Sequence, residues 1–210
     1  MTGVQGLGLA LAYLIGAIPI GFIVGLLMGT DVRRIGSGNI GATNVLRALG
    51  PRIGLPVFLA DVLKGVAGVA IGRAFGMDGW LLSMCALFVV LGHCYSVFMG
   101  FKGGKGVASS LGTVIMLEPA AAAIALGFFL LAVLPTRLVS LGSIVGAVVL
   151  PVAFYALNAH GPEAVVPLAA MSLIVIGRHH ENIERLLKGE EHRFGSPKRT
   201  EPGDGPAEEA

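Results

Sequence analysis

Charged side chains are scarce in this chain. Only 13% of its 210 residues are Asp, Glu, Lys or Arg, whereas 54% are hydrophobic. A soluble domain carries about 25% charged residues, which it needs to cover a surface exposed to water. The shortage argues against an ordinary soluble globule and predicts an integral membrane protein. The formal net charge is only +2 at pH 7, so no general attraction to nucleic acid is expected.

Cysteine and N-terminal positive charge are also in short supply. The two cysteines, Cys85 and Cys94, lie in one apolar run, where a helix would separate them by roughly 13 Å, too far for a disulfide. No Lys or Arg precedes Arg33, so the basic region of a secretory signal peptide is missing. The uncharged stretch Leu7–Met28 is therefore expected to be a retained first membrane span.

Seven apolar runs follow one another along the chain, and each is a candidate membrane-spanning helix. They cover about residues 7–28, 53–75, 80–101, 107–117, 119–135, 138–157 and 164–177. The sequence thus predicts an all-α polytopic membrane protein with seven transmembrane helices. Glu118 and Pro119 divide the stretch 107–136, for which one broken helix is the alternative. Two short helices are favoured, because six spans would place the basic C-terminal region outside.

The connecting segments alternate between basic and acidic. The basic ones hold Arg33, Arg34, Arg47, Arg52, Lys102, Lys105, Arg137, Arg178, Arg185 and Lys188. The connections around residues 76–79, 118–119 and 158–163 hold acids and no Lys or Arg. By the positive-inside rule the N-terminus is outside and the C-terminus is cytoplasmic. Residues 1–193 are expected to form one membrane domain, and 194–210 a disordered cytoplasmic tail.

The segment "RRIGSGNIGATNVLRALG", residues 33–50, joins glycines to polar and basic side chains. Its Gly-x-Gly-x-x-Gly spacing copies the dinucleotide fingerprint, but an apolar span precedes it where a strand is required. Glycine amides, small hydroxyls and a helix start near Ala42 would suit a bound anion, and Arg47 could pair with phosphate. An ordinary loop with topogenic arginines is the alternative.

Two further segments combine basic or polar side chains in the same way. "FKGGKGVASS", residues 101–110, lacks Walker A spacing, yet Lys105 beside glycines at a helix start could serve as a point charge for phosphate. In "GRHHENIERLLKGEEHR", residues 177–193, His179 and Asn182 share one helix face. A positive-inside anchor and a solvated interfacial helix are the respective alternatives. No His-Glu-x-x-His motif or cysteine cluster is present, so no metal site is predicted.

Asp61 and Lys64 are three residues apart within the second apolar run. Because buried charges are costly in a membrane, they are expected to form a structural ion pair on one helix face. A contact with a ligand is the alternative. His93, in the third run, is either a satisfied polar core residue or part of a site.

"SGNIGATNVLRALG", "FKGGKGVAS" and "RHHENIERLLKGEE" resemble, in order and spacing, the three signature motifs of the bacterial acyl-phosphate-dependent glycerol-3-phosphate acyltransferases, the PlsY family. "DVLKG" and "RLVSLGSI" resemble that family's second and sixth spans, and the resemblance runs from about residue 7 to 191. It implies a multi-pass enzyme of the bacterial inner membrane whose active site faces the cytoplasm. The enzyme would move an acyl group from acyl phosphate to the 1-hydroxyl of glycerol 3-phosphate. The products would be lysophosphatidic acid and phosphate, in the first step of phospholipid synthesis.

The resemblance also implies roles for individual residues. One phosphate would be held by Ser37, Gly38, Asn39, Gly41, Thr43, Asn44 and Arg47, and the other by Lys105 with Gly103, Gly104 and Gly106. His179 and Asn182 would orient substrate or the reacting carbonyl, with help from Ser143, and Glu190 would hold the tail helix. The catalytic set is then Ser37, Arg47, Lys105, His179 and Asn182. No cofactor is implied, the protein is expected to be a monomer among membrane lipids, and the acceptor of the hydroxyl proton stays open between His179 and a substrate phosphate.

Two other classes of membrane protein compete with this interpretation. A transporter for small anions would need polar groups across the midplane and often carries inverted repeats, and neither is found in the sequence. A non-catalytic scaffold would have no reason to concentrate phosphate-binding features in three segments. The His-x4-Asp pair of acyl-CoA-type acyltransferases is absent, since Glu184 and Arg185 stand five positions beyond the two histidines of the third segment.

Overall fold

The computed structural model describes residues 1–157 and 161–195, and within these ranges all regular structure is helical. The predicted all-α class is thus confirmed. The helices are α1 (Gly3–Ala17), α2 (Ile20–Leu27), α3 (Ala42–Leu49), α4 (Pro51–Ala74), α5 (Gly79–Cys94), α6 (Val107–Leu117), α7 (Pro119–Thr136), α8 (Val139–Leu157), α9 (Val165–Gly177) and α10 (His180–Leu187), with short 3-10 turns η1 (Val32–Arg34), η2 (Val97–Met99) and η3 (Pro162–Ala164). Most of the expected tail, residues 196–210, lies outside the described part of the chain.

In the part of the chain that the structure describes, five segments are long and apolar enough to cross a membrane: Gly3–Leu27, Pro51–Ala74, Gly79–Met99, Pro119–Thr136 and Val139–Leu157. The two remaining apolar helices are shorter, and α6, with 11 residues, is only about 17 Å long. The expected boundary between α6 and α7 is confirmed, because Glu118 is extended and separates them. The count of seven spans, and the side on which each terminus lies, stay predictions.

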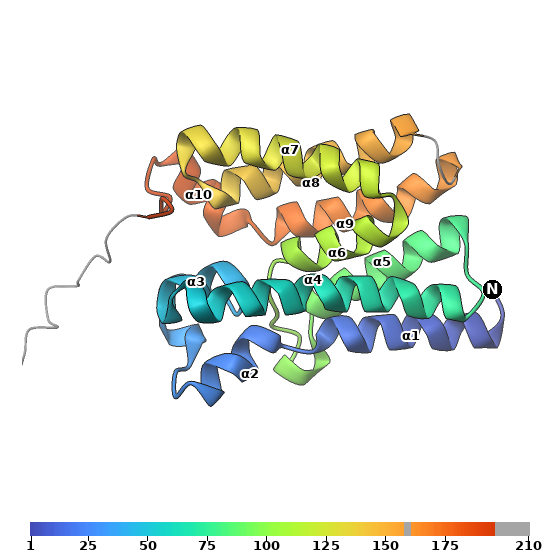
Figure 1. The fold of residues 1–210 in the computed structure, drawn as a ribbon, viewed down its shortest axis with the longest axis horizontal. Coiled ribbons are helices and arrows are strands. Elements are labelled where there is room, and N and C mark those ends of the chain that lie inside the picture. Colours follow the sequence, from blue (N-terminus) through green and yellow to red (C-terminus); the bar gives the residue numbers. More distant parts are fainter. Residues whose placement is uncertain (158–160, 196–210) are drawn as a thin grey trace, which may run out of the picture.

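The long helices lie lengthwise against one another, and α3 and α10 lie together at the end opposite the N-terminus (Figure 1). Helix α6 packs closely on α4. A Cβ atom at Gly65 would overlap the Ser109 carbonyl oxygen, and one at Gly112 would overlap that of Val62. Glycine at both positions therefore lets the two backbones touch, which brings the start of α6 against the middle of α4.

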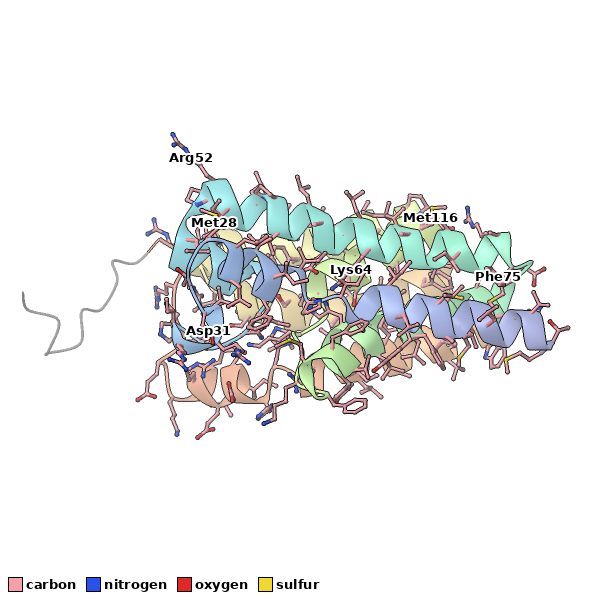
Figure 2. The ribbon with its side chains drawn as sticks, turned by 90° about the horizontal axis from the view of Figure 1, so that it is seen from below. Met28, Asp31, Arg52, Lys64, Phe75 and Met116 are labelled. Carbon is pink, nitrogen blue, oxygen red and sulfur yellow. The ribbon has the colours of Figure 1, made fainter. Side chains whose placement is uncertain are left out.

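The first apolar segment is broken, although a single helix was expected over residues 7–28. Pro19 cannot donate a backbone hydrogen bond, and α1 ends at Ala17 before α2 begins at Ile20. The carbonyls released at the break are satisfied by other elements: Ser96 Oγ donates to the Ala17 carbonyl over 2.5 Å, and Lys64 Nζ to that of Ile18 over 3.0 Å. Figure 2 places Lys64 in the middle of the bundle, at this interruption.

Candidate active site

An open cavity lies among the N-terminal part of α3, the start of α10 and the loop before α6. Side chains from all three glycine-and-basic segments line it, together with residues of α4 and α8. The predicted residues on its wall are Ser37, Asn39, Gly41, Thr43, Asn44, Arg47, Asp61, Lys105, Gly106, Ser143, His179 and Asn182. Residues that are far apart in the sequence thus share one polar chamber. The predicted residues away from the wall are Gly38, Lys64, Gly103, Gly104 and Glu190.

Asn44 organises the segment between α2 and α3, which we call the arginine loop (residues 31–41). Its side chain is 2% exposed, and Oδ1 accepts hydrogen bonds from the amide and the hydroxyl of Ser37 at 3.0 and 3.2 Å. Its Nδ2 donates to the Val32 carbonyl over 2.8 Å. Both ends of the Asn44 amide are therefore committed to the loop, and its contribution is to fix the position of Ser37.

Two amides of the arginine loop that were expected to bind phosphate are already occupied. The Gly41 amide donates to Asn39 Oδ1 over 2.8 Å, and the Gly38 amide donates to the Ile35 carbonyl over 3.1 Å. Gly38 has φ +66°, which favours glycine for a conformational reason. These two glycines close turns of the loop, and the expected role of their amides in holding an anion stays a prediction that would require these hydrogen bonds to be exchanged.

The glycines before Lys105 are also engaged by the backbone. In the lysine loop (residues 101–106), the Gly103 amide donates to the Cys94 carbonyl over 3.1 Å and the Gly104 amide to that of His93 over 3.0 Å. The expected role of these two amides in phosphate binding is therefore not supported. The pairing instead satisfies the last two carbonyls of α5 and fixes the backbone just before Lys105, which lines the cavity.

Arg47 and Lys105 provide the positive charge of the cavity. Burial lowers the pKa of Lys105 to about 8, and nearby Arg185 lowers it further, while Glu191 opposes the shift. Burial also lowers the pKa of Arg47, with an opposing effect from Glu191. A depressed pKa shows that the cations are held partly out of water, where an anionic ligand gains more from each of them.

His179 is a buried, neutral imidazole at the start of α10. Its side chain is 3% exposed, and Nδ1 lies 2.7 Å from the Val175 carbonyl oxygen, which can only accept. The proton is therefore assigned to Nδ1, and Nε2 keeps its lone pair. Burial, partly opposed by the bond to Val175, lowers the pKa of His179 to about 4. His179 and Asn182, which were expected to share one helix face, both line the cavity.

Glu191, rather than the predicted Glu190, holds the segment after α10. Its carboxylate accepts hydrogen bonds from Ser140 at 3.0 Å and Asn182 at 2.7 Å, and Arg185 Nε lies 2.9 Å from Oε2. Glu190 is exposed. The sequence offered two adjacent glutamates beyond the last periodic apolar residue, so helix periodicity could not choose between them. The partner on α8, Ser140, carried no signal of its own.

The expected ion pair within α4 is present and extends to α5 and α6. Lys64 Nζ lies 2.8 Å from Asp61 Oδ1, and both side chains are at most 6% exposed. His93 Nδ1 lies 3.7 Å from the same carboxylate oxygen and 3.0 Å from Ser109 Oγ. Asp61 and His93 are the members of this buried cluster that line the cavity.

A second cavity adjoins the first, and its walls are almost entirely apolar. It runs between α4, α6, α7, α8 and α9. Four residues line both cavities: Phe58, Val107, Phe129 and Ser143. Ser143 Oγ donates to the Val139 carbonyl over 2.9 Å, so its position at this boundary is fixed by its own helix. A polar chamber and an apolar groove therefore meet at one point.

Comparison with known proteins places this architecture in a family. A family model described as glycerol-3-phosphate acyltransferase matches residues 6–189. A glycerol-3-phosphate acyltransferase of Thermus thermophilus is 49% identical over 187 residues, which cover 89% of this chain and 94% of that protein. The corresponding enzymes of Aquifex aeolicus and Geobacter sulfurreducens are 47% and 44% identical, and each match covers 95% of the relative.

Two solved structures have the same fold. They are crystal structures of the integral membrane glycerol 3-phosphate acyltransferase PlsY, in a glycerol 3-phosphate form and a lysophosphatidic acid form, with TM-scores of 0.87 and 0.84. Both are 42% identical in sequence, and each match covers 92% of this chain and 96% of that one. The chain belongs to the glycerol-3-phosphate acyltransferase family of integral membrane proteins.

Proposed function

We propose that this protein transfers a fatty acyl group from acyl phosphate to the 1-hydroxyl of glycerol 3-phosphate. The observation that carries the proposal is the junction of a polar, basic chamber with an apolar groove, because each substrate then has a matching compartment. The two phosphates would lie near Arg47 and Lys105, and the acyl chain would extend into the groove. The relatives solved with glycerol 3-phosphate and with lysophosphatidic acid support the acceptor and the product.

The reaction needs no nucleophile from the protein. The 1-hydroxyl oxygen attacks the carbonyl carbon of acyl phosphate, the bond from that carbon to the phosphate oxygen breaks, and phosphate leaves with the bonding electrons. An acyl phosphate is already an activated anhydride, so positioning and charge stabilisation supply the catalysis. The boundary between the two cavities, beside Ser143, is where the carbonyl carbon would lie.

The hydroxyl proton has two candidate acceptors, and their basicities differ. Nε2 of His179 has a free lone pair, but the pKa of this histidine is only about 4. A phosphate monoester has a second pKa near 6 and is therefore the stronger base by about two pH units. We therefore infer that His179 orients the attacking hydroxyl, which donates a hydrogen bond to Nε2. The phosphate finally accepts the proton.

The location of the enzyme belongs to the same proposal. The chamber lies at the end of the bundle where the basic connections gather, and the positive-inside rule makes that end cytoplasmic. Both phosphorylated substrates would then enter from the cytoplasm, while the acyl chain lies within the inner membrane of a bacterium. Labelling that placed Asn39 and Asn182 on opposite sides of the bilayer would contradict this arrangement.

The test is acyl transfer by the purified, detergent-solubilised protein. Radiolabelled glycerol 3-phosphate is incubated with palmitoyl phosphate or palmitoyl-CoA, and lysophosphatidic acid is measured, with the acylated hydroxyl assigned by NMR. We expect 1-acyl product with palmitoyl phosphate alone. Absence of product, or equal rates with the two donors, would overturn the proposal. Lys105→Ala, prepared in parallel, controls for a contaminating acyltransferase.

A further inference from the structure

Arg178 was not among the predicted site residues, but it donates hydrogen bonds to the lysine loop, which carries Lys105. Its Nε donates to the Gly104 carbonyl over 3.1 Å, and its Nη2 donates to the Gly103 carbonyl over 2.8 Å. The guanidinium carbon lies 5.6 Å from the centre of the Tyr95 ring, which covers one face of the group. A planar side chain thus holds two consecutive carbonyls with donors on two different nitrogens, whereas lysine has all its donors on one nitrogen at the end of a flexible stem.

The same two glycines are held from the opposite side. Their amides donate to the carbonyls of His93 and Cys94, as described above, so both donors and both acceptors of this dipeptide are engaged. There is also no space for movement toward α5, because a Cβ atom at Gly104 would overlap the His93 ring. The backbone immediately before Lys105 is therefore fixed between α5 and Arg178.

The other end of Lys105 meets the segment that Arg178 begins. Lys105 Nζ donates to Asn182 Oδ1. Arg178 is the residue before His179 and caps the C-terminal end of α9. One arginine therefore connects the lysine loop to the corner from which His179 and Asn182 project.

We propose that Arg178 is a positioning residue that sets the place of Lys105 in the chamber by clamping the Gly103 and Gly104 carbonyls. The kinetic consequence rests on the proposed acyl transfer. The restraint on the ammonium of Lys105 is a geometric consequence of the same contacts, and it does not depend on the reaction that the protein catalyses. Loss of the clamp frees the loop, and an ammonium displaced by about 1 Å costs a reaction of this kind on the order of 100-fold in rate.

The kinetic test compares Arg178→Gln and Arg178→Lys with Lys102→Ala, which removes an exposed positive charge from the same loop. We expect kcat/KM for glycerol 3-phosphate to fall about 100-fold in Arg178→Gln and at least about 10-fold in Arg178→Lys. Lys102→Ala should stay within about twofold of the parent. Because Arg178→Lys keeps the charge, unchanged kinetics in that variant would overturn the clamp.

The geometric test needs no substrate. Detergent-solubilised proteins are treated briefly with acetic anhydride, and the acetylation of each lysine is followed by mass spectrometry. We expect Lys105 to react several-fold faster in both Arg178 variants than in the parent, while exposed Lys102 and Lys188 keep their rates.

An unchanged acetylation rate of Lys105, in a variant that elutes from a sizing column as the parent does, would overturn the inference, even if acyl transfer is normal. If Arg178→Gln aggregates, the more conservative Arg178→Lys decides the question. If the parent lacks acyl transfer, the proposed function fails and acetylation still decides the clamp.

Discussion

The side-chain amide nitrogen of Asn182 donates a 2.7 Å hydrogen bond to Oε1 of Glu191. The other end of the amide, Oδ1, accepts a hydrogen bond from Lys105. Because an asparagine amide has one donor end and one acceptor end, the carboxylate dictates which end faces the lysine. The contact thus connects the order of the segment after α10 with the position of a cation in the chamber.

Replacing Glu191 should damage the protein, and replacing Glu190 should not. Glu191→Ala leaves the buried Ser140 and Asn182 groups without their acceptor and removes the ion pair to Arg185. We expect a loss of about 1–3 kcal/mol in stability, visible as a lower thermal midpoint in detergent, together with reduced acyl transfer. Glu190→Ala is the matched control, and equal effects of the two substitutions would contradict the assignment.

The Glu191 network should also weaken in acid. Burial tends to raise the pKa of Glu191, but hydrogen bonds from Asn182, Arg185 and Ser140 together lower it by more, so that its pKa lies below the ordinary value of a glutamate. A group whose pKa is depressed by folding stabilises the protein above its unfolded pKa, and this stabilisation is lost as the pH falls through the folded value. Thermal midpoints measured from pH 6 down to pH 3 should therefore drop more in the parent than in Glu191→Gln.

Activity should decline in base because of Lys105. Its pKa of about 8 means that the ammonium of the free enzyme is lost above that pH, and phosphate binding needs the charge. We expect kcat/KM to fall about tenfold per pH unit above pH 8, since this parameter reports the free enzyme. Lys105→Arg should lose this decline. Lys105→Ala and Arg47→Ala should each reduce activity about 100-fold at pH 7 without unfolding the protein. A flat profile up to pH 9.5 in the parent would count against the assignment.

His179 should contribute through orientation at neutral pH. Since its pKa is about 4, the imidazole is already neutral at pH 6, and Nε2 is free to accept a hydrogen bond. We expect His179→Ala to lower kcat about 100-fold, at the lower end of the range for groups that assist proton transfer. The parent should show no histidine-dependent step in rate between pH 6 and 8. A variant profile unchanged in height and shape would remove His179 from the reaction.

The features that could be predicted from the sequence are those decided by local chemistry. Pro119 favours the first turn of a helix, and Glu118 before it caps α7, while the three-residue spacing of His179 and Asn182 puts them on one side of the chain at the start of α10. The roles of Gly103 and Gly104 could not be predicted, because the sequence does not show whether a glycine amide is free or donates to a carbonyl at the end of α5. The choice of Glu191 over Glu190 likewise could not be predicted, because it depends on a hydrogen bond to Ser140, which is far from both glutamates in the sequence.

Asp61 and Lys64 should be more costly to alter singly than together. Each neutralises the other in the interior, so Lys64→Met leaves an unpaired buried carboxylate, a change that costs about 3–5 kcal/mol. The double variant Asp61→Leu/Lys64→Met should recover much of that loss in thermal midpoint. Recovery should be incomplete, since Lys64 also satisfies the Ile18 carbonyl at the break between α1 and α2. Additive losses would show that the pair does not act as a unit.

The apolar groove predicts a control of acyl chain length. Gly146 of α8 lines the groove, and a Cβ atom there would lie 3.4 Å from the Ala125 carbonyl oxygen and 3.6 Å from Phe129 Cβ. A phenylalanine side chain at this position would take up part of the groove. We expect the Gly146→Phe variant to transfer decanoyl groups almost normally and palmitoyl groups at least about tenfold more slowly, since a loss of only two buried methylenes, at about 0.8 kcal/mol each, has an effect of that size. Gly127→Phe on α7 is the control, because that position is exposed and open. Equal losses with both chain lengths would mean that the chain takes another path.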